Sequence, residues 1–308
     1  MQIAKADGGR QVRVYDEQVA EVLREEARRV EELRVLLDSP DAVRGVRAGE
    51  LVTHYQPQVD LRTGRVLGVE ALVRWEHPRL GLVGPGAFLD LVEEHGLMSR
   101  LTATVLEQAA RQSVRWREAG MPLRVSVNLS ATCLGDPQLL PLLDDVLAAT
   151  TMRARDLVLE VTETSLMADP TSALEQMREI ARRGIGISID DYGTGYSSLG
   201  YLNDLPATEL KIDRSFIDRL GTDPRTAAIV AGTVTLGHHL GLRLVAEGVE
   251  DEATLAAVRE LGCDEVQGYV HSRPLPADAL TAWVRDREAA HRPEGSSRPG
   301  VLDGARPA

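Results

Sequence analysis

Strand-like and helix-like segments alternate along this chain from Glu50 onwards, and this alternation constrains the fold more than any other feature. Short apolar runs bounded by turn residues predict strands, and longer runs with apolar residues three or four positions apart predict helices. The predicted strands are Leu51–Leu61, Arg65–Trp75, Arg124–Leu129, Leu157–Val161, Ile185–Asp190, Thr208–Ile212, Leu242–Glu247 and Glu265–Tyr269. The predicted helices are Gly86–His95, Arg100–Ala119, Pro137–Ala149, Pro170–Arg183, Pro224–Leu240, Glu252–Leu261 and Ala277–Ala290. This order predicts an α/β fold, a (β/α)8 TIM-like barrel over residues 50–288.

The two ends of the barrel sequence add further expectations. A short turn at Thr63-Gly64 joins the first two strands, which predicts a hairpin and therefore an antiparallel first strand. Before the barrel, an N-terminal helix is predicted over Asp16–Leu37, from the apolar positions Val19, Leu23, Val30, Leu33 and Leu37. Either this helix forms a coiled coil, imperfect because Glu26 interrupts the seam, or it packs on its own domain. Residues 289–308 are rich in Pro, Gly and Ser and are expected to be a disordered tail.

Seven of the predicted strands end in a polar residue that is suited to ion or phosphate chemistry. These residues are Glu70, Asn128, Glu160, Asp190, Lys211, Glu247 and Gln267. Barrel enzymes carry their chemistry at the C-terminal ends of the strands, so the seven side chains are expected at one rim. Several like charges at one rim are costly without cations. The pattern therefore predicts a multinuclear metal site.

The strand before Asp190 shows which side chains face the barrel interior. Ile185, Ile187 and Ile189 share one face, and Ser188 and Asp190 share the other, because side chains alternate along a strand. Asp191 reaches the interior only if the strand stops before it, and the following glycines, at 193 and 195, permit a sharp turn. Two adjacent carboxylates under a glycine-hinged loop suggest a metal site with a mobile lid. For an isolated motif of this kind, a surface turn with solvated aspartates is the alternative.

The ligand types and the composition narrow the chemistry. Carboxylates and an amide are hard oxygen donors, which favours Mg²⁺ or Mn²⁺ over structural zinc. Two such cations would share the Asp190–Asp191 pair as a bridge. Cys133 and Cys263 lack metal-ligand spacing, and with no signal peptide or membrane segment a reduced, cytoplasmic setting is expected. The formal net charge of −12 argues against nonspecific binding to DNA.

The segment Asp190–Leu199, DDYGTGYSSL, resembles the loop motif of EAL domains, the bacterial phosphodiesterases that hydrolyse cyclic di-GMP. Tyr192 stands where that family usually has Phe. The motifs EALVR, VNLS, LEVTE, LKID, AEGVE and VQGY resemble their EAL counterparts in the same order over residues 50–288. The resemblance implies an enzyme that uses two divalent cations, Mg²⁺ or Mn²⁺, to linearise cyclic di-GMP to pGpG in second-messenger signalling.

The resemblance also implies a role for each matching residue. Metal ligands fall on Glu70, Asn128, Glu160, Asp190 and Asp191, and Glu247 and Gln267 hold metal or metal-bound water. Lys211 resembles the lysine that contacts the nucleophilic water, and whether it or Glu247 handles the proton stays open. Substrate binding falls on Gln56 and Arg74, and positioning of the lid loop on Glu163 and Glu250. For these supporting positions a plain structural role, such as a salt bridge for the charged ones, is the alternative. Gln58 and His271 depart from the family pattern.

Residues Ala4–Asp16 resemble the closing residues of a GGDEF domain. The expected organisation is therefore a GGDEF remnant at 1–16, a helical linker at 17–49, the EAL barrel at 50–288 and the tail at 289–308. It implies an upstream GGDEF or sensor domain, and EAL domains commonly form homodimers. The rival function is a catalytically silent cyclic di-GMP receptor, and a barrel enzyme for another phosphodiester is disfavoured by the complete motif set.

Overall fold

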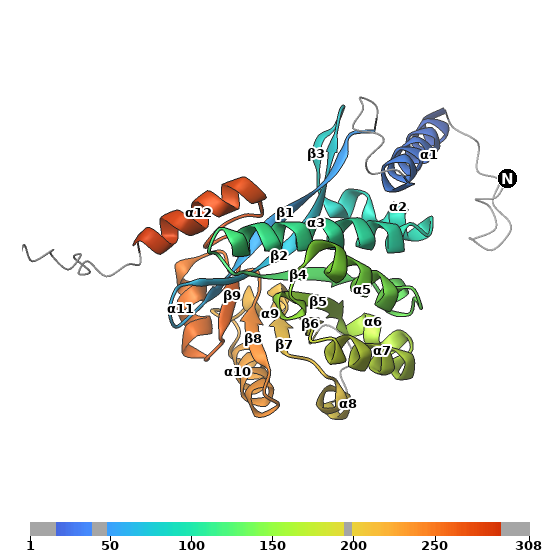
Figure 1. Cartoon of the computed structure of the whole chain (residues 1–308). Coiled ribbons are helices and arrows are strands. Elements are labelled where there is room, and N and C mark those ends of the chain that lie inside the picture. Colours follow the sequence, from blue (N-terminus) through green and yellow to red (C-terminus); the bar gives the residue numbers. More distant parts are fainter. Residues whose placement is uncertain (1–16, 39–47, 194–198, 291–308) are drawn as a thin grey trace, which may run out of the picture.

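A computed structural model of the chain describes residues 17–38, 48–193 and 199–290. Its core is a closed barrel of eight strands (Figure 1). The barrel strands are β1 (Glu50–Asp60), β2 (Val66–His77), β4 (Arg124–Leu129), β5 (Leu157–Thr162), β6 (Gly186–Tyr192), β7 (Glu209–Ile212), β8 (Arg243–Ala246) and β9 (Glu265–Gln267). Strand β1 runs antiparallel to both β2 and β9, and the other neighbours in the ring are parallel. The predicted barrel with an antiparallel first strand is confirmed.

Two short strands extend this sheet beyond the barrel. Strand β3 (Gly81–Val83) pairs with β2, and β10 (Leu275–Pro276) pairs with β1. Neither strand is predicted from the sequence. Both are too short to carry the alternating pattern on which a strand prediction depends.

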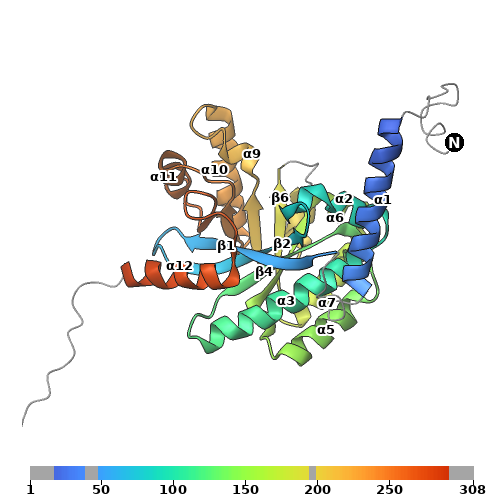
Figure 2. The same cartoon turned by 90° about the horizontal axis from the view of Figure 1, so that it is seen from above.

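Helices cover the outside of the barrel (Figures 1 and 2). The helices predicted in the sequence are α2 (Leu89–Glu94), α3 (Met98–Glu118), α5 (Leu139–Thr150), α7 (Pro170–Arg182), α10 (Pro224–His239), α11 (Glu252–Glu260) and α12 (Ala277–Ala290). Aspartates begin several of them: the side chains of Asp169, Asp223 and Asp251 each accept a hydrogen bond from a backbone N–H of the first turn. Shorter helices that the sequence did not predict are α4 (Ala131–Leu134), α6 (Glu163–Ala168), α8 (Leu199–Asp204) and α9 (Arg214–Ile217), with 3-10 turns at Pro85–Ala87 and Ala154–Asp156.

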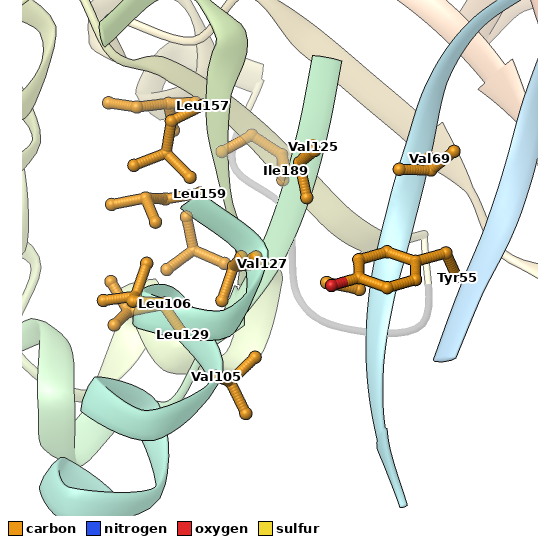
Figure 3. Close-up of a cluster of buried hydrophobic side chains, with 14 of the residues drawn as sticks. Tyr55, Val69, Val105, Leu106, Val125, Val127, Leu129, Leu157, Leu159 and Ile189 are labelled. Carbon is orange, nitrogen blue, oxygen red and sulfur yellow. The ribbon is translucent and has the colours of Figure 1, made fainter. Parts of the chain in front are cut away.

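The apolar core lies between the outer face of the sheet and the helices. Figure 3 shows Val125, Val127 and Leu129 of β4 next to Val105 and Leu106 of α3. All five side chains are buried. Burial of one such side chain contributes roughly 1.5–3 kcal/mol to folding. This packing holds the strands in register and so fixes the polar ends of the strands relative to one another.

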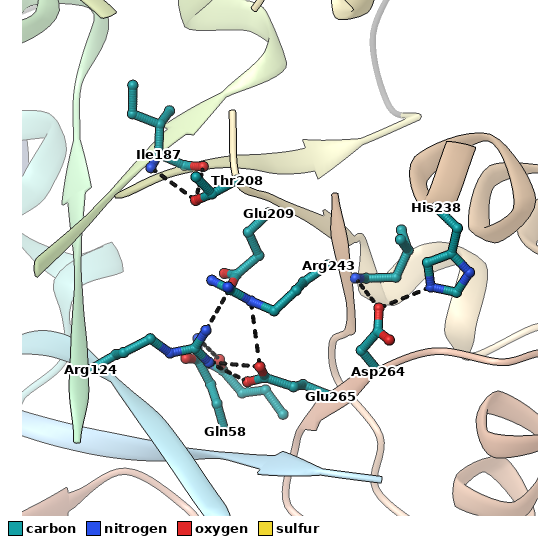
Figure 4. Close-up of polar contacts among 11 residues, drawn as sticks. Gln58, Arg124, Ile187, Thr208, Glu209, His238, Arg243, Asp264 and Glu265 are labelled. Carbon is teal, nitrogen blue, oxygen red and sulfur yellow. Dashed lines mark hydrogen bonds and ion pairs between the residues drawn. The ribbon is translucent and has the colours of Figure 1, made fainter. Parts of the chain in front are cut away.

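The interior of the barrel is closed at its N-terminal end by charged residues, which we call the floor cluster (Figure 4). Arg124, Glu209, Arg243 and Glu265 are each the first residue of a barrel strand. Nη2 of Arg124 lies 2.6 Å from Oε2 of Glu265, and Nη2 of Arg243 lies 3.2 Å from Oε2 of Glu209. Two arginines thus face two buried glutamates, and the formal charges of the floor cluster balance.

Helix α1 (Glu17–Asp38) lies against the barrel beside α2 and α3, on the side away from α12 (Figure 2). Its apolar positions Val30, Leu33 and Leu37 are buried. Oε2 of Glu32 lies 3.1 Å from Nε2 of the buried His77. Of the two alternatives drawn from the sequence, the structure therefore supports a helix packed on its own domain.

Three expectations fall wholly or mostly outside the described residues. They are the GGDEF-like segment 4–16, the second half of the linker and the tail. Helix α12 extends to Ala290, two residues past the expected end of the barrel. None of the helices in the described ranges has the length and apolarity needed to cross a bilayer.

Candidate functional site

The paired aspartates stand at the end of β6, where the strand changes register. The pairing of β6 with β7 is irregular between Ile189 and Tyr192. Asp191 has a φ of +54° and Gly193 a φ of +99°, and the backbone N–H of Asp191 donates to Oδ1 of Asp190 at 3.0 Å. The expectation that the strand stops before Asp191 is wrong, since β6 extends to Tyr192. The left-handed turn at Asp191, a conformation that Asp tolerates better than most residues, takes the place of the stop.

Four buried or nearly buried carboxylates surround the ammonium of Lys211, and we call these five residues the acid cluster. The Nζ atom lies 2.6 Å from Oε1 of Glu247 and 2.8 Å from Oε2 of Glu160. It lies 3.5 Å from Oδ1 of Asp190 and 3.8 Å from Oε2 of Glu70. Lys211 itself is 1% exposed. One buried positive charge therefore faces four carboxylates.

Two amide side chains hold Glu70 in place. Nδ2 of Asn128 donates to Oε1 of Glu70 at 2.6 Å, and Nε2 of Gln267 donates to Oε2. The same Nε2 donates to Oε1 of Gln56 at 3.2 Å. Both oxygens of Glu70 are thus fixed by donors from two other strands of the ring, β4 and β9.

The pKa values of the carboxyl groups reflect the crowding. Burial raises the pKa of Glu247 to about 8, and the nearby Asp190 and Glu70 add to this rise against the attraction of Lys211. Burial likewise raises the pKa of Glu160 well above its ordinary value. Burial opposes ionisation of Lys211 too, but the surrounding carboxylates outweigh it and raise the pKa of its ammonium. Burial and mutual repulsion therefore leave the acid cluster in need of added positive charge, as a proton or as a cation.

The acid cluster and Asp191 fit a divalent cation. Carboxylate oxygens of Asp190, Asp191 and Glu247 all lie within 4.8 Å of one another. Oε1 of Glu160 is buried and has no hydrogen-bond partner among the described residues, which leaves a hard acceptor free for a ligand. All these donors are oxygens, the ligands that Mg²⁺ and Mn²⁺ prefer.

The sequence assigns Gln267 to metal or metal-bound water, whereas in the structure its amide is hydrogen-bonded to other side chains. Its Oε1 accepts a hydrogen bond from Nε2 of Gln58 at 3.1 Å, and its nitrogen faces Glu70. Gln267 therefore holds a carboxylate and does not present its oxygen to the acid cluster. Asn128 likewise directs its Nδ2 at Glu70, although its side chain is exposed at the rim.

The predicted substrate-binding residues stand beside the acid cluster. Gln56 is buried, and its Nε2 donates to the backbone oxygen of Ser272 at 3.2 Å. Arg74 lies on the same face of β2 as Glu70 and is half-buried, with Nη1 donating to the backbone oxygen of Val73 at 2.8 Å. Burial lowers the pKa of the Arg74 guanidinium against the influence of Tyr269 and Glu70.

The two predicted loop-positioning residues differ. Oε2 of Glu163, at the start of α6, accepts a hydrogen bond from the backbone N–H of Gly193 at 3.1 Å, where the lid loop begins. Glu250 lies 2.9 Å from Nη1 of Arg214 in an exposed ion pair. In the part of the chain that the structure describes, only Glu163 therefore contacts the loop. The rest of the lid, residues 194–198, lies outside the described ranges.

Comparisons with known proteins all point to one family. The family model described as "EAL domain" matches residues 40–274. The bifunctional diguanylate cyclase/cyclic di-GMP phosphodiesterase MucR of Pseudomonas aeruginosa is 45% identical over 255 residues, 82% of this chain and 37% of MucR. The cyclic di-GMP phosphodiesterase RocR of the same organism is 36% identical over 236 residues, 77% of this chain and 60% of RocR. The chain thus spans less than two thirds of either relative.

Solved structures give the same picture. The PaMucR phosphodiesterase in complex with c-di-GMP has a TM-score of 0.76 and 43% identity, and the match covers 82% of this chain and 99% of that one. The EAL domain of Mycobacterium smegmatis DcpA has a TM-score of 0.66 and 32% identity, with 77% and 98% covered.

The raised pKa of Glu247 predicts how the stability of the metal-free protein depends on pH. Between pH 4.5, the ordinary value, and about pH 8, the folded state binds more protons at this carboxyl than the unfolded state does. The free energy of unfolding should therefore fall as the pH rises through this window, and Glu247→Gln should flatten the fall. Thermal unfolding in chelator from pH 5 to 9 measures both slopes.

The matched control for this experiment is Glu260→Gln, at an exposed position on α11. Its slope should equal that of the wild type. A wild-type protein whose stability rises from pH 5 to 8, or a Glu247→Gln variant with the wild-type slope, would contradict the electrostatic description.

Proposed function

The chain belongs to the EAL domain family, and from this premise we propose that it hydrolyses cyclic di-GMP to linear pGpG. The observation that carries the proposal is the acid cluster, in which one ammonium faces four carboxylates and Asp191 stands close by. The related PaMucR phosphodiesterase structure, which matches 82% of this chain, is a complex with c-di-GMP.

Two divalent cations, Mg²⁺ or Mn²⁺, complete the proposed site. Their ligands are drawn from Glu70, Asn128, Glu160, Asp190 and Asp191. Glu247 supports the same site by holding metal or metal-bound water, and Gln267 supports it by holding Glu70. When bound, the cations supply positive charge at the scissile phosphate and help to ionise the attacking water. The orphaned Oε1 of Glu160 supports this assignment, because a buried oxygen without a donor needs a positive partner.

Lys211 and Glu247 divide the remaining work. Four carboxylates surround the ammonium of Lys211, so it keeps its proton and acts as a fixed positive charge. Glu247 lies 2.6 Å from that ammonium and, once ionised, takes the proton from the attacking water. Its pKa of about 8 in the metal-free protein would be lowered by cations bound nearby. A lysine suits this position, because its compact ammonium fits among several oxygens where a planar guanidinium would not.

Arg74 and Gln56 hold the substrate in this proposal. A guanidinium can form two parallel hydrogen bonds with a phosphate, and Arg74 extends beyond Glu70 on the same face of β2. Local positive charge is needed, because the formal net charge of the whole chain is −12. Glu163 holds the first residue of the lid and thereby the turn that orients Asp191.

Turnover of cyclic di-GMP tests the proposed function. Purified protein with Mg²⁺ or Mn²⁺ should convert cyclic di-GMP to pGpG, and EDTA should stop the reaction until metal is restored. Asp190→Ala and Glu160→Ala should each lower turnover at least about a hundredfold, because each removes charge that stabilises the transition state. Chromatography of the nucleotides measures the product.

The control for these variants is Asp286→Ala, at an exposed position on α12, which should keep wild-type turnover. Undiminished turnover in EDTA would exclude the metal mechanism. Tight binding of cyclic di-GMP without formation of any product would show that the protein is a receptor and not an enzyme.

The assembly is also part of the proposal: a cytoplasmic homodimer, with an upstream sensor or GGDEF domain in the full-length protein. Ile229 of α10 is 53% exposed and lines a hollow of about 270 Å³ together with Tyr192, Gly193 and Phe216, next to the lid. An exposed apolar side chain in this hollow supports pairing through the lid face.

Light scattering tests the assembly. The wild type should be a dimer, and Ile229→Arg should shift it to the 33.6 kDa monomer, because a buried charge without a partner opposes association. Leu82→Arg is the matched control. Leu82, on strand β3, is as exposed as Ile229, and this variant should stay dimeric. A monomeric wild type, or the reverse behaviour of the two variants, would refute this assignment.

A further inference from the structure

Gln58 is a buried polar residue that the proposed mechanism does not use. It lies on β1, two positions after Gln56 and on the same face, and is 1% exposed. In the sequence it is no more than a departure from the family pattern. In the structure it lies in the barrel interior between the floor cluster and the acid cluster, close to Arg124 and Glu265 (Figure 4).

The hydrogen bonds of Gln58 have a defined direction. Its Nε2 donates to Oε1 of Gln267 at 3.1 Å, so the nitrogen of Gln267 is left to donate to Glu70 and Gln56. If the amide of Gln267 were turned over, two nitrogens would face each other at Gln58. An oxygen would then face the carboxylate of Glu70. Each of these contacts would place like partners together, because an amide has one donating end and one accepting end.

The hairpin of β1 and β2 leaves room for the Gln58 side chain. Gly68 of β2 is the residue opposite Gln58, and a Cβ at Gly68 would lie 2.7 Å from Oε1 of Gln58. Any other residue at Gly68 would therefore displace the Gln58 side chain. On its other side Gly68 abuts the side chain of Arg124. Gly68 thus leaves room for the Gln58 amide in the position from which its nitrogen donates to Gln267.

From this arrangement we infer that Gln58 is a positioning residue for the catalytic site. It fixes the amide of Gln267 so that the nitrogen holds Oε2 of Glu70, and the second Glu70 oxygen is held by Asn128. The inference rests on the proposed function in so far as Glu70 is a metal ligand. Residues that orient a metal ligand typically change metal affinity 10–100-fold when they are replaced.

Removal of the amide should therefore weaken metal binding without unfolding the protein. Gln58→Met keeps the length of the side chain and removes both polar atoms. We expect its affinity for Mn²⁺, measured by calorimetry without substrate, to fall about tenfold. The double variant with Gln267→Met should bind Mn²⁺ no more weakly than Gln267→Met alone, because the two residues act in series.

Gln108→Met is the matched control. Gln108, on α3, is also an amide with two hydrogen bonds to β1, from Nε2 to the backbone oxygen of Leu51 and to Oε1 from Thr53. Its replacement should lower the thermal midpoint and leave the Mn²⁺ affinity unchanged. Gln58→Leu serves as a second variant if the melting profile of Gln58→Met is not intact.

A readout in the metal-free protein separates this inference from the proposed function. The side-chain amide resonances of Gln267 should shift in Gln58→Met and stay in place in Gln108→Met, whether or not the protein turns over cyclic di-GMP. Unmoved Gln267 resonances overturn the inference. So does a Mn²⁺ affinity equal to that of Gln108→Met, or additive losses in the double variant. If wild-type protein neither binds Mn²⁺ nor forms pGpG, the proposed function fails, and the resonances still decide the role of Gln58.

Discussion

The ammonium of Lys211 among four carboxylates is the interaction on which the rest of this site depends. Its counter-charges come from β2, β5 and β6 and from the residue after β8, so only a closed barrel brings them together. The cost of burying these charges is high unless each has a partner. One lysine cannot neutralise four carboxylates. The site therefore remains short of positive charge, and this shortage is what makes it a site for cations.

Charged residues gather at both ends of the barrel interior, and the two clusters differ in whether their charges balance. In the floor cluster two arginines face two glutamates, and the charges balance. In the acid cluster the carboxylates outnumber the ammonium, and burial raises the pKa values of Glu160 and Glu247. A balanced cluster has no formal charge left over, whereas an unbalanced one is available for a ligand. Gln58 lies between the two and connects the hairpin to Gln267.

Local patterns in the sequence predict much of this architecture, and contacts between distant strands account for the rest. The alternation along β6 correctly turns Asp190 inward, where its Oδ1 lies 3.5 Å from Nζ of Lys211, because the alternation depends only on neighbouring residues. The same reasoning ends the strand too early. It cannot foresee that Asp191 adopts a positive φ within an irregular pairing with β7. Gln58 was visible as an unusual residue, but its role depends on the register that sets Gly68 opposite it.

In the proposed function, divalent cations make up the missing positive charge around Lys211. Equilibrium dialysis of Mn²⁺ against the wild type and Asp190→Asn tests it most directly, because the variant removes one carboxylate charge and little volume. The wild type should bind two Mn²⁺ per chain, and Asp190→Asn should bind fewer, with a melting profile close to that of the wild type. A wild type that binds no Mn²⁺, or a variant that binds it equally well, would contradict the account.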